Sequence, residues 1–100
     1  MTTSKGALKI VIESDTVKLI GELVINTVSL FKDTIMNSGL KNKKLILDLS
    51  EITVMDSSGL GSLIRLSRES EEKIILKNIA PQAKNMIKVS ECSELFEIKD

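Results

Sequence analysis

Residues 44–61, which read KLILDLSEITVMDSSGLG, decide the fold. Residues 44–49 form a largely apolar run, which is typical of a strand buried within a sheet. Residues 50–55 are expected to form a connection to a helix that begins at Ser58 and reaches about Ser70. That helix is indicated by apolar residues three and four positions apart, namely Leu60, Leu63, Ile64 and Leu66. The stretch therefore predicts a central strand followed by an amphipathic helix.

Upstream of this stretch, two segments rich in β-branched residues predict a β-hairpin. Residues 8–13 read LKIVIE and residues 16–20 read TVKLI, and Ser14 and Asp15 between them supply turn chemistry. The strand edge from Leu8 to Ser14 is expected to be exposed, which would offer a route to self-association.

A helix is predicted between the hairpin and the central strand. Its apolar face is indicated by the spacing of Val24, Val28, Phe31 and Ile35. Asn26 or Thr27 is expected to cap the start of this helix, and Gly39 is expected to end it in a left-handed conformation.

Two further strands and a third helix are predicted downstream. Residues 73–77 and 95–98 are expected to be strands, and Pro81 suits the first turn of a helix. The inward residues of that helix are expected to be Ala83, Met86, Ile87 and Val89. This alternation predicts a single α/β domain over residues 1–100. Its mixed sheet is expected to begin with a hairpin, to continue with parallel strands and to pack against helices. The residues expected to point inward include Leu19, Phe31, Leu45, Leu47, Ile64 and Ile75.

Charge and aromatic content argue against a nucleic-acid partner. Fourteen basic and fourteen acidic residues give a net charge of zero, so no long-range field attracts a polyanion. The two aromatic residues, Phe31 and Phe96, are too few to provide stacking surfaces for single strands. The basic residues Lys41, Lys43 and Lys44 are interpreted as a solvated turn.

The sequence also predicts a cytoplasmic protein without a cofactor. No apolar run approaches the roughly 20 residues that a membrane span requires, and no apolar signal segment follows the first six residues. The single cysteine, Cys92, cannot form an internal disulfide, and the chain has no histidine to complete a usual zinc site. Cys92 is therefore expected to be a buried or half-buried small residue.

The residues at the start of the second predicted helix carry the chemical signal. Asp56, Ser57 and Ser58 are each good N-cap residues. Gly59 and Gly61 each cost about 1 kcal/mol relative to alanine inside a helix, so some other interaction should compensate for them. Two interpretations stay open here. One is simple capping, and the other is a site where glycine and free backbone N–H groups admit a ligand or a phosphate, with a serine as the phosphorylated residue.

An enzyme is the first rival class, and the residues argue against it. Ser57 has no histidine to serve as its general base, because the chain contains none. Gly59 and Gly61 have neither the Gly-Lys-Ser or Gly-Lys-Thr ending of a phosphate-binding loop nor the spacing of a dinucleotide fold. We therefore predict that the protein is not an enzyme.

Taken together, the chain resembles the STAS domain family, whose best-known members are bacterial anti-sigma factor antagonists. The resemblance covers nearly the whole chain. It rests on LIGEL at 19–23, on LILDLS at 45–50 leading into VMDSSGLG at 54–61, and on LFEI at 95–98. The DSSGLG element is the most specific part.

The resemblance implies a phosphorylation switch that controls transcription. In the family the serine directly after the aspartate, here Ser57, is phosphorylated by the partner anti-sigma factor, an ATP-binding serine kinase. The unphosphorylated protein would bind this partner and so free a sigma factor. Phosphorylation would end the binding, and a phosphatase would reset the cycle. By the same resemblance, the surround of the phosphosite comprises Glu22, Asp56, Ser58, Gly59 and Gly61.

The sequence departs from the family pattern at one position near this site. Many members carry an aspartate directly after Gly-Glu-Leu, whereas this chain has Val24. The departure favours an alternative function, a non-enzymatic STAS adaptor that docks on a transporter ATPase or a larger signalling assembly.

Overall fold

The structure is a computed structural model that describes residues 2–5, 7–40 and 44–99. Strands and helices alternate after an opening hairpin, as the sequence predicts. The elements in chain order are β1 (Thr2–Lys5), β2 (Leu8–Glu13), β3 (Thr16–Leu23), α1 (Val28–Ser38), β4 (Ile46–Met55), α2 (Ser57–Glu69), β5 (Ile74–Lys77), α3 (Pro81–Val89), a 3-10 turn (Ser93–Leu95) and β6 (Phe96–Lys99).

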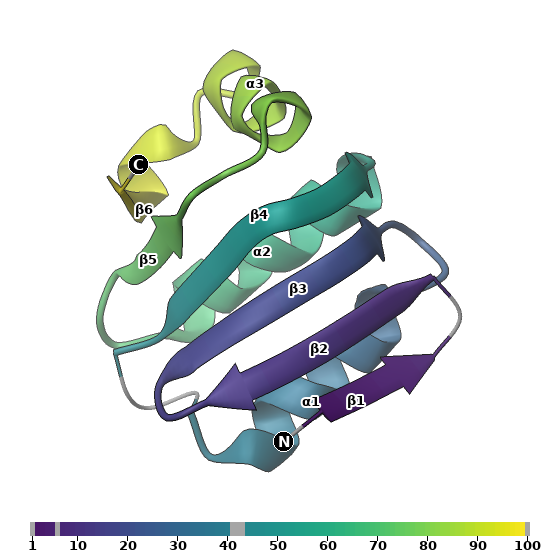
Figure 1. The fold of residues 1–100 in the computed structure, drawn as a ribbon. Coiled ribbons are helices and arrows are strands. Elements are labelled where there is room, and N and C mark those ends of the chain that lie inside the picture. Colours follow the sequence, from purple (N-terminus) through teal and green to yellow (C-terminus); the bar gives the residue numbers. More distant parts are fainter. Residues whose placement is uncertain (1, 6, 41–43, 100) are drawn as a thin grey trace.

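Within the described residues, six strands form one mixed sheet in chain order from β1 to β6. The first three strands pair antiparallel, and the pairs from β3 to β6 are parallel. A helix lies between the two strands of each parallel pair along the chain, and Figure 1 shows α1 and α2 together behind the sheet. The predicted α/β class, the opening hairpin and the parallel strands joined by helices are confirmed.

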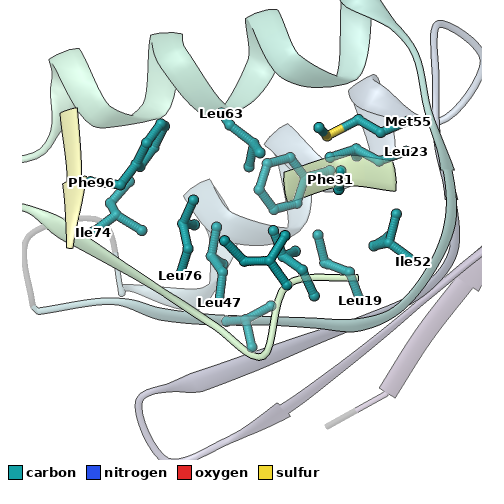
Figure 2. Packing of buried hydrophobic residues seen from close by; sticks show 14 of the residues in the cluster. Leu19, Leu23, Phe31, Leu47, Ile52, Met55, Leu63, Ile74, Leu76 and Phe96 are labelled. Atoms are coloured by element: carbon teal, nitrogen blue, oxygen red, sulfur yellow. The ribbon is translucent and has the colours of Figure 1, made fainter. Parts of the chain in front are cut away.

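The core lies between the sheet and its helices (Figure 2). Phe31 from α1 and Leu63 from α2 fill the space above the sheet residues Leu19 and Leu47. The predicted inward residues confirmed as fully or almost fully buried in this core are Leu19, Phe31, Leu45 and Leu47. Ile75 is buried too, but it does not belong to this cluster, because its side chain alternates with those of the core residues Ile74 and Leu76. Ile64 is partly buried and packs against the same core.

Strand β4 is longer than the sequence pattern predicts. The predicted connection at residues 50–55 is wrong, because β4 runs through them to Met55. Two register shifts against β3 each insert an extra residue into β4, as in a β-bulge. The buried positions of this strand are therefore 47, 49, 52 and 55, so the two-residue alternation that marks a strand is lost.

The start of α1 differs from the prediction, whereas its end agrees. Thr27 stands at the N-cap position, but its side chain makes no capping hydrogen bond to the helix, and Asn26 lies outside the helix altogether. Val24 belongs to the turn before the helix. Gly39 ends α1 with φ of 77°, in the left-handed conformation predicted for it.

The sequence pattern gives no indication of β1. The predicted exposed edge at Leu8 is wrong for residues 8–11, because β1 pairs antiparallel with them. Residues 2–5 read TTSK, which has no apolar alternation, so neither periodicity nor composition marks a strand there.

The third helix follows its prediction except at its last residue. Ala83 and Ile87 are buried and Met86 is half-buried, whereas Val89 is exposed, so its inward assignment is wrong. Val89 lies two residues beyond Ile87, and two steps along a helix turn a side chain away from the buried stripe. The last strand begins at Phe96, because Leu95 ends the 3-10 turn.

We expect Leu47→Ala to lower the free energy of unfolding by about 2–5 kcal/mol, because Leu47 is fully buried and its truncation leaves a cavity. Val54→Ala on the same strand is the control, since Val54 is 44% exposed and should cost only about 0.5 kcal/mol. Urea denaturation followed by circular dichroism measures both. Equal losses for the two variants would contradict the described burial.

Candidate functional site

The candidate site lies where β4 ends and α2 begins. Asp56 is the single residue between the two elements and is the N-cap of α2. Its Oδ1 accepts a hydrogen bond of 2.8 Å from the backbone N–H of Gly59, and its backbone oxygen accepts one of 3.0 Å from Leu60. Of the three cap candidates in the sequence, Asp56 therefore performs the capping.

The second carboxylate oxygen of Asp56 holds a different segment. Oδ2 accepts a hydrogen bond of 3.1 Å from the backbone N–H of Ile25, in the turn between β3 and α1. The N–H of Gly59, followed by that of Ile25, lowers the pKa of Asp56 below its ordinary value, because both donors favour the ionised form. Both oxygens serve the fold, which leaves Asp56 poorly placed to act as a general base.

Ser57 and Ser58 differ in their exposure. Ser57 is the first residue of α2 and is exposed, and its hydroxyl makes no hydrogen bond to any residue in the described ranges. Ser58 is half-buried and lines a groove between α1 and α2. A modifying enzyme therefore reaches the Ser57 hydroxyl more easily than the Ser58 hydroxyl.

The two glycines of the motif have different surroundings. A Cβ on Gly59 would lie 2.0 Å from the backbone oxygen of Leu23 and 2.9 Å from Cγ of Met55, so only glycine fits there. A Cβ on Gly61 would meet nothing within 4 Å. Gly59 therefore serves the packing of α2 against β3, whereas no contact within the described chain requires Gly61.

The turn at residues 22–27 is fixed by the buried hydroxyl of Thr27. This hydroxyl accepts a hydrogen bond of 3.0 Å from the backbone N–H of Val24 and lies 2.8 Å from the backbone oxygen of Glu22, to which it donates. Glu22 pairs with Val54 at the ends of β3 and β4, but no hydrogen bond or ion pair joins its side chain to a described residue. The contact that Glu22 makes in this turn comes from its backbone oxygen, and its place in the phosphosite surround stays a prediction.

Gln82 on α3 holds the other side of the junction. Its side-chain amide accepts a hydrogen bond from the backbone N–H of Met55 and donates one to the backbone oxygen of Met55, each at 3.1 Å. Sequence reasoning missed Gln82 and Ile25 as neighbours of the site. No local signal marks either residue, because both reach the site only through contacts across 27 or more positions.

The remaining predictions about ligands concern residues away from this junction. No group of three or more His, Cys, Asp or Glu side chains within residues 2–5, 7–40 and 44–99 is arranged to hold a metal ion. Cys92 is buried, as predicted, and burial raises the pKa of its thiol. Lys41 and Lys43 lie outside the described residues, and Lys44 is exposed with its Nζ 3.7 Å from Glu97. None of the helices in the described part combines the length and apolar content needed to cross a membrane.

Comparison with known proteins places this geometry in a family context. The family model for the STAS domain matches residues 8–100. A candidate anti-sigma factor antagonist from Thermotoga maritima superimposes with a TM-score of 0.71 at 22% identity, covering 91% of this chain and 84% of that one. The unphosphorylated anti-sigma factor antagonist SpoIIAA superimposes with a TM-score of 0.72 at 22% identity, covering 92% and 87%. At this identity the two structures establish a shared fold.

The glycines should respond in opposite ways to alanine. Gly59→Ala is expected to lower the free energy of unfolding by about 1–3 kcal/mol, because the added carbon overlaps the Leu23 backbone. Gly61→Ala is expected to raise it by up to about 1 kcal/mol, since alanine favours the helix and has room. Urea denaturation tests the pair, and a destabilised Gly61→Ala variant would show that Gly61 has an internal role.

Asp56→Asn should reveal the contribution of the Asp56 charge through its pH dependence. Because the folded-state pKa is lowered, the carboxylate stabilises the fold fully above the ordinary aspartate pKa. That contribution is lost as the pH falls from this value through the lowered pKa. Wild type should therefore exceed Asp56→Asn in stability at about pH 7, and the difference should shrink toward about pH 3. A difference that stays constant with pH would contradict this account.

Proposed function

Because the chain belongs to the STAS domain family, we propose that it is an anti-sigma factor antagonist switched off by phosphorylation of Ser57. The observation that carries the proposal is the Ser57 hydroxyl. It is exposed at the first residue of α2 and has no hydrogen-bond partner among the described residues, beside an aspartate whose two oxygens are already engaged. A kinase can modify this hydroxyl without first breaking a contact of the fold.

The position of Ser57 at a helix start favours a phosphate there. A phosphoserine carries about −1.5 to −2 charges, and the positive end of the helix dipole tolerates them. The N-cap bond between Asp56 and Gly59 does not involve Ser57, so modification leaves the cap in place. The proposed switch therefore changes the charge of a surface and not the fold beneath it.

The surroundings of Ser57 explain how this charge would end binding. Ile25, whose N–H binds Asp56, is 64% exposed, and Val54, two residues before Asp56, is 44% exposed. Val24, which stands where many family members carry an aspartate, is half-buried and adds to this apolar part of the surface near the site. A partner that covers these side chains removes them from water, and burying an unpaired dianion beside them would be strongly unfavourable.

The proposed cycle assigns all catalysis to partners. The unphosphorylated chain binds an anti-sigma factor that is an ATP-dependent serine kinase, and a sigma factor is thereby freed. The kinase ends the interaction by phosphorylating Ser57, and a phosphatase restores it. In this scheme the chain needs no general base, which fits the absence of histidine from its sequence.

Phosphorylation should depend on Ser57 and not on Ser58. The purified chain is incubated with its cognate anti-sigma factor kinase and ATP, and phosphate is located by intact mass and peptide mapping. Wild type and Ser58→Ala should each gain one phosphate, and Ser57→Ala should gain none. Ser57→Ala should stay folded and lose no more than about 0.5 kcal/mol, because Asp56 provides the cap.

The affinity for the anti-sigma factor kinase should also depend on the residue at position 57. Ser57→Ala is expected to retain affinity for the kinase, whereas Ser57→Asp should weaken it, because one carboxylate supplies part of the phosphate charge. Labelling of Ser58 in place of Ser57 would show that the residue assignment is wrong. If neither serine accepts phosphate from the kinase, the adaptor function, favoured by Val24, replaces the switch.

A further inference from the structure

A groove between α1 and α2 leads away from the proposed phosphorylation site. It has a volume of about 430 Å³ and is lined by both helices. Ser58 and Ile25 lie among its lining residues near Ser57, and Met36 lines it in the third turn of α1. We call this feature the α1–α2 groove.

Two large apolar side chains that line the α1–α2 groove are exposed to solvent. Ile25 is 64% exposed and Met36 is 53% exposed, although most large apolar side chains of the described chain are buried. Phe31 and Leu66 contribute to its floor. Exposed apolar side chains gathered around a concave surface mark a binding site for an apolar face of another molecule.

The charged residues of the groove are mostly basic. Lys32 on α1 and Arg65 on α2 both line it and are exposed, and neither forms an ion pair with a residue of the described ranges. Glu69 is the acidic residue of the lining and has an interaction of its own. Because Lys32 and Arg65 lie on different helices of the groove, each can pair with an acidic side chain on one flank of an occupant.

Gly61 supplies a third observation. It lines the groove in the second turn of α2, and a side chain there would meet nothing within 4 Å. Glycine at this position costs about 1 kcal/mol of helix stability without an internal contact to explain it. Because glycine has no side chain, nothing projects into the groove at this position, and a bulky side chain of a partner can approach the α2 backbone.

We propose that the α1–α2 groove binds a short amphipathic helix with acidic flanks, contributed by the protein that recognises Ser57. The identity of that protein rests on the proposed function. The chemistry of the groove does not depend on it. Helix α1 has 11 residues and is about 16 Å long, which matches about three turns of a docked helix. The apolar face of the occupant covers Ile25 and Met36, and its acidic residues pair with Lys32 and Arg65.

A synthetic helix tests the groove without the kinase. The probe is a peptide of about 16 residues with leucine at helical spacing and glutamate on both flanks, and the control peptide has lysine in place of each glutamate. Amide chemical shifts of the labelled protein are followed during titration. The glutamate peptide should shift Ile25, Met36 and Gly61 and bind about tenfold more tightly than the lysine peptide.

Three variants of the protein test the same contacts by their effect on the affinity for the glutamate peptide. Lys32→Glu combined with Arg65→Glu should weaken the glutamate peptide about tenfold. Gly61→Leu should weaken it by a similar factor, because the new side chain fills the groove while the helix gains stability. Arg68→Glu is the matched control, since Arg68 is an exposed cation of α2 that does not line the groove, and it should leave the affinity nearly unchanged.

Several outcomes would overturn the proposal. Equal affinity for the two peptides, equal effects of the groove variants and Arg68→Glu, or shifts confined to the sheet would each do so. Shifts at Gly61 and Met36 that depend on protein concentration without peptide would identify a second copy as the occupant. An absence of any shift at millimolar peptide would show that the groove binds no such helix.

The kinase then separates this proposal from the proposed function. If the kinase phosphorylates Ser57 equally well in wild type and in the Lys32 and Arg65 double variant, with equal affinity, the switch stands and the groove assignment fails. If the groove binds the glutamate peptide but no kinase labels Ser57, the switch fails and the groove remains a helix-binding site. Loss of kinase affinity in the double variant, but not in Arg68→Glu, supports both.

Discussion

The close approach of α2 to the end of β3 is the constraint on which the site depends. Gly59 lies so near the backbone oxygen of Leu23 that no side chain fits between them. This contact brings the start of α2 beside the turn that leads into α1, where Asp56 reaches the N–H of Ile25 as well as that of Gly59. One carboxylate therefore joins two segments separated by 31 positions in the chain.

Fixed surroundings give the exposed Ser57 a defined position on the surface. Thr27 orders the turn on one side through the backbone of Glu22 and Val24, and Gln82 holds the backbone of Met55 on the other. These hydrogen bonds use backbone groups, so they place few demands on the side chains that face solvent. The hydrogen bond at Val24, for example, is donated by its backbone N–H to Thr27, so it does not depend on the side chain at this position.

The sequence was most informative where the residues of one element carry a consistent signal. The hairpin strands and β5 are short runs rich in β-branched residues, and α3 has apolar residues at helical spacing; the predictions for these elements are confirmed apart from Val89. The second half of β4 has bulges that break the alternation, and β1 consists of polar residues. Hydrophobic periodicity therefore could not reveal either strand segment. At the site, the motif identified Asp56 as a capping candidate, but its second partner, Ile25, depends on the tertiary fold.

The two glycines of the DSSGLG motif show why the sequence alone could not decide between simple capping and a ligand site. Gly59 and Gly61 are alike in the sequence, and both are costly in a helix. In the structure, one faces the Leu23 backbone and the other faces open space in the α1–α2 groove. The cost of Gly59 is offset inside the protein, because it allows α2 to pack against β3. No contact within the described residues offsets the cost of Gly61, and this agrees with the occupant that we propose for the α1–α2 groove.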